Sequence, residues 1–224
     1  MKQGIFITGT NTDIGKTYVS GCITKLIHDQ GISCGYYKAA LSGAPLVHGT
    51  YIPEDAYHVL DYAGLQDKDI CVSHIYEHAY SPHLSARVEQ KPFQMENVRQ
   101  DIKQFKQSHD FIIAEGSGGI ICPLALEDDH CIMLTDVMRE LNVPLLIVTN
   151  SDLGTINSTV LTINYARALS LPIAGVIMND FNFSNPIHRD NYHAIEQLGN
   201  IRILSVVAHN KGLSNPQLCL ENII

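Results

Sequence analysis

The chain lacks any apolar run long enough to cross a membrane. A transmembrane helix needs roughly 18 or more consecutive apolar residues, and no stretch of the 224 residues approaches that length. The first apolar run, GIFI, spans about four residues, which is too short for the hydrophobic region of a signal peptide. We therefore expect a cytoplasmic protein that does not bind membranes.

Basic residues and paired cysteines are also scarce. Lys and Arg number 15 against 23 Asp and Glu, for a formal net charge of −8. Nucleic acids and anionic membranes are bound by basic surfaces, so this composition argues against both kinds of partner. The six cysteines contain no CxxC pair, which fits reduced thiols better than a disulfide framework or a zinc site.

No linker, repeat or low-complexity tract interrupts the chain, so we expect one domain over residues 1–224. Short apolar runs alternate with longer amphipathic segments. Strands are expected at 4–8, 33–37, 110–114, 144–149, 173–178 and 203–207, and helices at 16–30, 53–63, 95–107, 132–141, 155–169 and 185–198. Continuously apolar runs such as PLLIV are typical of strands covered on both faces. The pattern predicts an α/β fold, a doubly wound and mostly parallel sheet with helices on both faces, with ligands at the carboxyl ends of the strands.

The segment GTNTDIGKT, residues 9–17, lies between the first expected strand and helix. Its end, Gly15-Lys16-Thr17, matches the phosphate-binding pattern GxxxxGK[ST], but the first glycine comes one residue early, so the loop is a longer variant. Loop amides at a helix N-terminus attract an anion. Lys16 is expected to reach the β- and γ-phosphates, and the Thr17 hydroxyl to ligate Mg²⁺. This context favours a P-loop NTPase-like fold over a chance GKT in a glycine-rich turn.

Signatures of two common P-loop classes are missing. A GTPase would carry Asn-Lys-x-Asp, whereas residues 150–153 read Asn-Ser-Asp-Leu. A partitioning-type ATPase usually has an extra lysine early in the loop, where this chain has Asn11.

Polar residues follow two further apolar runs. Glu115 ends the run FIIA and precedes a glycine-rich segment, and a carboxylate there fits a metal-binding acid better than a surface turn. Lys38 ends another expected strand, where spacing alone favours equally a ligand-facing lysine and a solvated one.

Three other positions stay open. Asp55 opens an expected helix, where an acid that complements the helix dipole is commoner than a Mg²⁺ ligand. The amides of residues 154–157 could hold a carboxylate or only begin a helix. Asn179 could read a base edge or close a turn. Among the eleven histidines, His74 and His78 have helical spacing, but we expect surface residues there, and a solvated loop at 128–130.

Five blocks together, GTNTDIGKT, YKAALSG, SPHLSA, EGSGG followed by PL, and LGTIN, resemble the dethiobiotin synthetase family from residue 4 to about residue 207. The resemblance implies a ligase that uses ATP, Mg²⁺, CO2 or bicarbonate and 7,8-diaminononanoate, and a homodimer with the substrate site at its interface. It implies catalytic roles for Lys16, Lys38, Thr12 and Ser42, and Mg²⁺ ligation by Thr17, Asp55 and Glu115. It implies nucleotide contacts from Asp13, Ile14, Gly15, Lys16, Thr17, Glu115, Gly118 and Asn179. It implies substrate contacts from Thr12, Lys38, Ser42, Gly154, Thr155, Ile156 and Asn157.

The chain departs from the family pattern at several positions. Ala39 stands where a proline is usual after the lysine, and Asp152 stands where many members have a basic residue or glycine. Ser205 and Ala208 replace a Gly-x-x-Pro pattern that would flank the base. Two other functions are compatible with the motifs: a related P-loop enzyme that amidates or carboxylates another substrate, and an ATP-driven switch.

Overall fold

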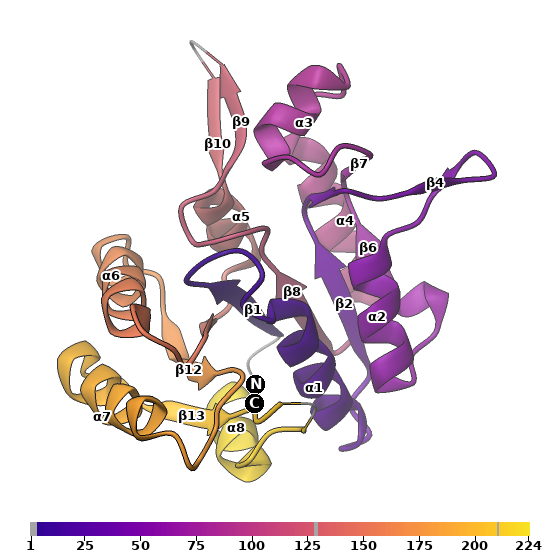
Figure 1. Cartoon of the computed structure of the whole chain (residues 1–224). Helices are drawn as coiled ribbons and strands as arrows, with labels where there is room; N and C mark the ends of the chain where they lie inside the picture. Colours follow the sequence, from indigo (N-terminus) through magenta and orange to yellow (C-terminus); the bar gives the residue numbers. More distant parts are fainter. Residues whose placement is uncertain (1–3, 128–129, 210) are drawn as a thin grey trace.

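A seven-stranded sheet forms the centre of the computed structural model, which describes residues 4–127, 130–209 and 211–224 (Figure 1). The strand order is β13-β12-β11-β1-β8-β2-β6, and every neighbouring pair is parallel. The strands are β1 (Gly4–Gly9), β2 (Cys34–Lys38), β6 (Ile70–Val72), β8 (Phe111–Glu115), β11 (Leu145–Thr149), β12 (Ile173–Met178) and β13 (Ile203–Val206). The predicted parallel α/β fold is confirmed, and β6 is an edge strand that the sequence pattern did not predict.

Helices cover both faces of this sheet. On one face lie α1 (Lys16–His28), α2 (Glu54–Ala63) and α8 (Pro216–Ile223), and on the other lie α4 (Met95–Ser108), α5 (Leu134–Leu141), α6 (Thr155–Ala168) and α7 (Pro186–Gly199). Ile5 and Ile7 of β1 face the α1 side and Phe6 faces the opposite side, because successive side chains of a strand alternate. Burying such a side chain contributes about 1.5–3 kcal/mol, and this double burial is why the strands read as unbroken apolar runs.

The starts of α7 and α8 are encoded locally. Each helix begins with proline in its first turn, directly after an asparagine. Asn185 Oδ1 accepts from the Ile187 N–H, and Asn215 Oδ1 accepts from the Leu218 N–H. Asparagine at this position satisfies a helix N–H that would otherwise lack a partner, and proline has none to lose.

The helix expected at 132–141 is wrong at its start. Residues Ile132 and Met133 belong to strand β10 (His130–Met133), which pairs antiparallel with β9 (Pro123–Glu127), and α5 begins at Leu134. The apolar residues here satisfy strand alternation as well as helical spacing, and the Asp136 carboxylate caps the helix by accepting from the Met133 N–H. In Figure 1 this hairpin projects beside α3 (Pro82–Val88). Part of the loop expected at 128–130 lies outside the described residues.

Two stretches for which the sequence predicts no strand or helix contain short elements. Residues 39–52 hold β3 (Leu41–Ser42), β4 (Leu46–Val47) and β5 (Thr50–Tyr51), and residues 71–93 hold β7 (Ile75–Tyr76) and α3. Two-residue strands and a seven-residue helix are too short to show a hydrophobic period. In the part of the chain that the structure describes, no helix is both long and apolar enough to span a membrane.

Candidate nucleotide and substrate site

The loop between β1 and α1 lies at the carboxyl end of the central strand. Gly15 takes the N-cap position of α1 with φ 86°, and a Cβ atom there would lie 2.0 Å from Asn179 Nδ2. Only glycine fits a left-handed backbone this close to another side chain. Asn179 in turn donates from Nδ2 to the Ile14 carbonyl at 3.1 Å, so it holds the loop from the end of β12.

Lys16 is buried beneath this loop. Its ammonium donates to the Asn11 carbonyl at 2.9 Å. Burial lowers the pKa of Lys16, although the Glu115 carboxylate opposes that change. A cation that makes one backbone contact in a water-poor setting is well suited to receive phosphate oxygens.

Glu115, at the end of β8, is only 2% exposed and accepts four hydrogen bonds. Thr17 Oγ1 and Lys38 Nζ donate to Oε1 at 3.0 and 3.1 Å. Ser20 Oγ and the Tyr36 hydroxyl donate to Oε2 at 2.7 and 3.0 Å. A buried carboxylate is tolerated only when it is paired and hydrogen-bonded, and both oxygens of Glu115 meet that condition.

Lys38 lies beside Glu115 because the two residues are register partners at the ends of β2 and β8. Its ammonium contacts both Glu115 Oε1 and Asp55 Oδ2, and its side chain is only 6% exposed. Burial would lower the pKa of Lys38, but the two carboxylates outweigh it and hold that pKa above its ordinary value. The alternative of a solvated lysine is therefore wrong, and Lys38 faces the same site as Lys16.

Asp55 and Glu115 contact one cation, the Lys38 ammonium, and Thr17 donates to the same Glu115 oxygen that Lys38 contacts. Hydroxyl and carboxylate oxygens are the ligands that Mg²⁺ prefers, usually together with water and phosphate. Within the described ranges no group of three or more His, Cys, Asp or Glu could hold a metal by itself. The residues fit a magnesium ion that reaches the site with phosphate oxygens.

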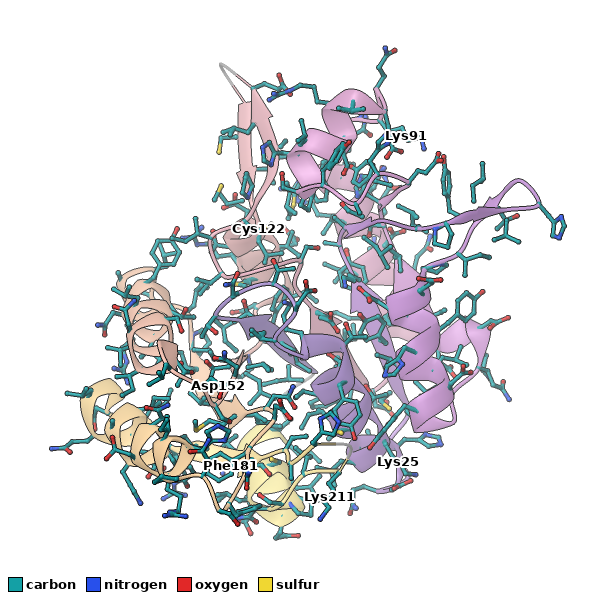
Figure 2. The ribbon with its side chains drawn as sticks, in the orientation of Figure 1. Lys25, Lys91, Cys122, Asp152, Phe181 and Lys211 are labelled. Atoms are coloured by element: carbon teal, nitrogen blue, oxygen red, sulfur yellow. The ribbon has the colours of Figure 1, made fainter. Side chains whose placement is uncertain are left out.

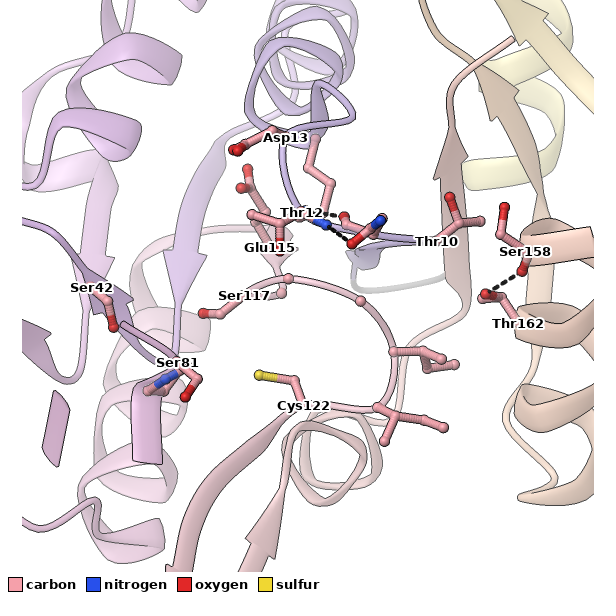
Figure 3. A pocket seen from close by; sticks show the side chains of 18 of the residues that line it. Thr10, Thr12, Asp13, Ser42, Ser81, Glu115, Ser117, Cys122, Ser158 and Thr162 are labelled. Atoms are coloured by element: carbon pink, nitrogen blue, oxygen red, sulfur yellow. Dashed lines mark hydrogen bonds between the residues drawn. The ribbon is translucent and has the colours of Figure 1, made fainter. Parts of the chain in front are cut away.

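A cleft of about 1190 Å³ opens at the carboxyl ends of the strands. Figure 3 shows Ser42 and Ser81 on one side of it and Ser158 and Thr162 of α6 on the other, with Thr12, Asp13 and Glu115 above. The segment 115–123 also lines the cleft, and in it Gly118 has φ 70° and Ser117 Oγ donates to the Ala40 carbonyl at 2.6 Å.

The cleft contains an orphan hydroxyl. Ser42 Oγ is buried, and no hydrogen-bond partner is found for it among the residues that the structure describes. Because Ser42 also lines the cleft, its hydroxyl is available to a bound molecule.

Only part of the expected carboxylate-binding segment, residues 154–157, lines the cleft. Asn157 lines the cleft, but Gly154, Thr155 and Ile156 do not. Thr155 is buried and donates to the Asn150 carbonyl at 2.7 Å. Residues 154–156 therefore lie outside the cleft of their own chain, whereas Asn157 lines it.

Asp152 does not face the cleft. The Asn182 N–H donates to His188 Nδ1 at 2.9 Å, which leaves His188 Nε2 to donate to Asp152 Oδ1 at 3.1 Å. His188 also contacts the Phe181 ring, and Figure 2 shows Asp152 near Phe181 and far from Cys122, which lines the cleft. The carboxylate is held toward α7, so it does not oppose an anion in this chain's cleft.

His74 holds the segment that follows Lys38. The Gln94 N–H donates to His74 Nε2 at 3.1 Å, so Nδ1 carries the proton and donates to the Ala39 carbonyl at 3.1 Å. The expectation of a surface residue is wrong for His74, which is buried against Phe93, and burial lowers its pKa. An imidazole contact thus restrains the backbone at Ala39, directly after Lys38.

Sequence reasoning missed Ser20, Tyr36 and His74. The signal for Ser20 and Tyr36 was present. Ser20 lies one helical turn after Thr17, and Tyr36 lies two strand residues before Lys38, so each shares a face with a predicted site residue. His74 comes from a short irregular segment and had no such signal.

Known proteins resemble the chain in sequence over most of its length. A family model described as an AAA domain matches residues 3–217. ATP-dependent dethiobiotin synthetase BioD of Clostridium perfringens is 45% identical, over 92% of this chain and 91% of that protein. The proteins of that name from Brachyspira hyodysenteriae and Clostridium botulinum strain 657 are 46% and 40% identical, over 92% and 100% of this chain and 92% and 97% of their own lengths.

Solved structures resemble the chain in fold. They include MinD in the MinC:MinD complex of Aquifex aeolicus (TM-score 0.59, 16% identity, 92% of this chain and 81% of that one). A ParA family ATPase of Chlorobium tepidum is equally similar (TM-score 0.59, 16% identity, 94% and 86%). At this identity the likeness shows the fold alone, and it confirms the predicted P-loop NTPase-like architecture.

Proposed function

The chain belongs to the ATP-dependent dethiobiotin synthetase family, and we propose that it carboxylates 7,8-diaminononanoate with CO2 and closes the ureido ring, converting ATP to ADP and phosphate. The observation that carries this proposal is the pair of buried lysines, Lys16 and Lys38, in one cleft around Glu115. Phosphoryl transfer needs positioning and charge neutralisation rather than a protein nucleophile, and this site offers both.

One amine of the substrate takes up CO2 to form a carbamate. A carbamate oxygen then accepts the γ-phosphoryl group of ATP, which gives a carbamic-phosphoric anhydride. The second amine attacks its carbon, closes the ring and expels phosphate. Lys16 and the amides of residues 13–17 bind the phosphates, and the Lys38 ammonium stabilises the negative charge that moves between ATP and the carbamate.

Thr17, Asp55 and Glu115 would hold Mg²⁺, which supplies charge neutralisation on the phosphate oxygens. Gly118 allows the loop after β8 to approach the nucleotide, and Asn179 contacts the adenine as well as the P-loop. Thr12 and Ser42 contact the reacting end of the diamine. The orphan hydroxyl of Ser42 supports that role.

The substrate carboxylate is received by the amides of residues 154–157 from the second subunit of a homodimer. Two observations support this arrangement: residues 154–156 lie outside their own chain's cleft, and the neighbouring Leu153 side chain is 79% exposed. The enzyme works in the cytoplasm on small molecules, without a nucleic acid or membrane partner.

The test is phosphate release from MgATP with and without 7,8-diaminononanoate plus bicarbonate, together with mass detection of dethiobiotin. We expect phosphate release that depends on the diamine and matches the cyclic product mole for mole. ATP turnover that ignores the diamine would overturn the proposed reaction and favour a related P-loop enzyme or a switch.

A further inference from the structure

We propose that Tyr36 and Ser20 are positioning residues that hold Glu115 so that only its Oε1 atom is presented to the cation of the nucleotide site. The inference rests on the proposed function in one respect, that the nucleotide arrives with a divalent metal. It assigns a task to two buried hydroxyls that touch neither cleft nor substrate.

The two oxygens of Glu115 have different surroundings. Oε1 contacts Thr17 and Lys38, which both line the cleft. Oε2 contacts Ser20 and Tyr36, which are fully buried and do not line it. The carboxylate therefore has one oxygen on the ligand side and one tied to the protein interior.

The hydroxyl pair is suited to hold a metal-binding carboxylate. Rotation of Glu115 to present both oxygens would break the bonds from Ser20 and Tyr36 together. The Tyr36 hydroxyl is fully buried and donates to Oε2 at 3.0 Å, and the Ser20 hydroxyl donates to the same oxygen at 2.7 Å. Neutral donors also leave the negative charge of Glu115 for the cation, whereas a second ammonium would compete for it. Partners of this kind orient a ligand, and their loss typically weakens metal binding by about 10–100-fold.

The same strand supplies a matched control. Tyr37 is as buried as Tyr36, at 1% and 0% exposure, but it points to the opposite face of the sheet. Its hydroxyl shares a hydrogen bond of 2.8 Å with Ser73 Oγ. Removing either phenolic oxygen deletes one hydrogen bond of a buried tyrosine, but only the Tyr36 oxygen touches Glu115.

The experiment titrates Mn²⁺ into the full-length protein with saturating ADP and counts bound metal by electron paramagnetic resonance. We expect Tyr36→Phe to raise the Mn²⁺ dissociation constant about tenfold, Ser20→Ala to raise it in the same direction, and Tyr37→Phe to leave it within about twofold of wild type. Calorimetry of ADP binding in excess chelator should give the same affinity for all four proteins.

Three results would overturn the proposal: an unchanged Mn²⁺ affinity in Tyr36→Phe and Ser20→Ala, an equal loss in Tyr37→Phe, or an equal loss of metal-free ADP binding. If Tyr36→Phe does not fold, Ser20→Ala decides by the same criteria. A wild-type protein that binds Mn²⁺ with ADP but forms no dethiobiotin would refute the proposed reaction and leave this inference standing.

Discussion

The substitution Glu115→Gln measures how strongly the buried charge network stabilises the fold. The carboxylate accepts two donors at each oxygen, whereas a glutamine amide has one accepting oxygen. That oxygen must face Lys38, which can only donate, so the amide nitrogen takes the place of Oε2. Ser20 and Tyr36 can turn their hydroxyls to accept from it, and the hydrogen bonds are largely kept. The change therefore removes mainly the negative charge beside the buried Lys38.

Removing one partner of a buried ion pair typically costs about 3–5 kcal/mol. We expect the lower end, about 3 kcal/mol, because Asp55 still contacts the Lys38 ammonium from a side chain that is 43% exposed. For a chain of this length each kcal/mol lowers Tm by about 2–4 °C, so the melting temperature should fall by about 6–12 °C.

The assay is urea unfolding followed by circular dichroism, without nucleotide or magnesium, so that ligand binding does not contribute. A double-mutant cycle then pairs this change with Lys38→Met. The loss of unfolding free energy caused by Lys38→Met should be at least about 1 kcal/mol smaller in the Glu115→Gln background than in wild type, because the two residues interact directly. A loss below about 1 kcal/mol for Glu115→Gln, or additive effects in the cycle, would refute the reasoning.

Three further changes test other parts of the site. Lys16→Ala should abolish turnover while the circular dichroism spectrum and cooperative melting stay native-like, and retained turnover would contradict the phosphate-binding role. Gly15→Ala should lower stability by about 1–3 kcal/mol and prevent ADP binding, measured by calorimetry, because φ is 86° and the new Cβ would overlap Asn179. His74 has a lowered pKa in the folded protein, so its contribution to stability is present above about pH 6.5 and is lost as the pH falls below that value. When the free energy of unfolding is measured in urea between pH 7.5 and 5.5, it should fall more steeply with decreasing pH in wild type than in His74→Asn. Parallel curves for the two proteins would show that His74 does not cause the loss of stability at low pH.

Much of the fold was predictable because its signals are local. Strands such as β8 and β11 are continuously apolar. The motif at residues 9–17 marks the start of the helix that follows it. The hairpin β9–β10 was not predictable, because Ile132 and Met133 satisfy strand and helix spacing equally. The short strands and α3 contain too few residues to show any period.

The residues of the site likewise fall into those that the sequence predicts and those that it does not. Lys16, Thr17 and Glu115 stand in recognisable motifs, and the structure brings them together. Asp55 belongs to the site because it contacts Lys38 from α2. Its position at the start of a helix gives no indication in the sequence of that partner. The position of the His74 side chain depends on its hydrogen bond to the Ala39 carbonyl, 35 residues earlier in the chain. Contacts of this kind depend on tertiary packing rather than on residue spacing.

The central position of β1 has a consequence for how the protein is made. This strand is synthesised before both of its neighbours, which are residues 111–115 and 145–149. Thr17 likewise cannot form its hydrogen bond to Glu115 until that residue, 98 positions later in the chain, has been synthesised. Pairing over such separations closes a large loop and is slow compared with local contacts. A ribosome must therefore release residues through 149 before the first strand can be paired on both sides, so capture of a nucleotide by the nascent chain would report that most of the sheet has assembled.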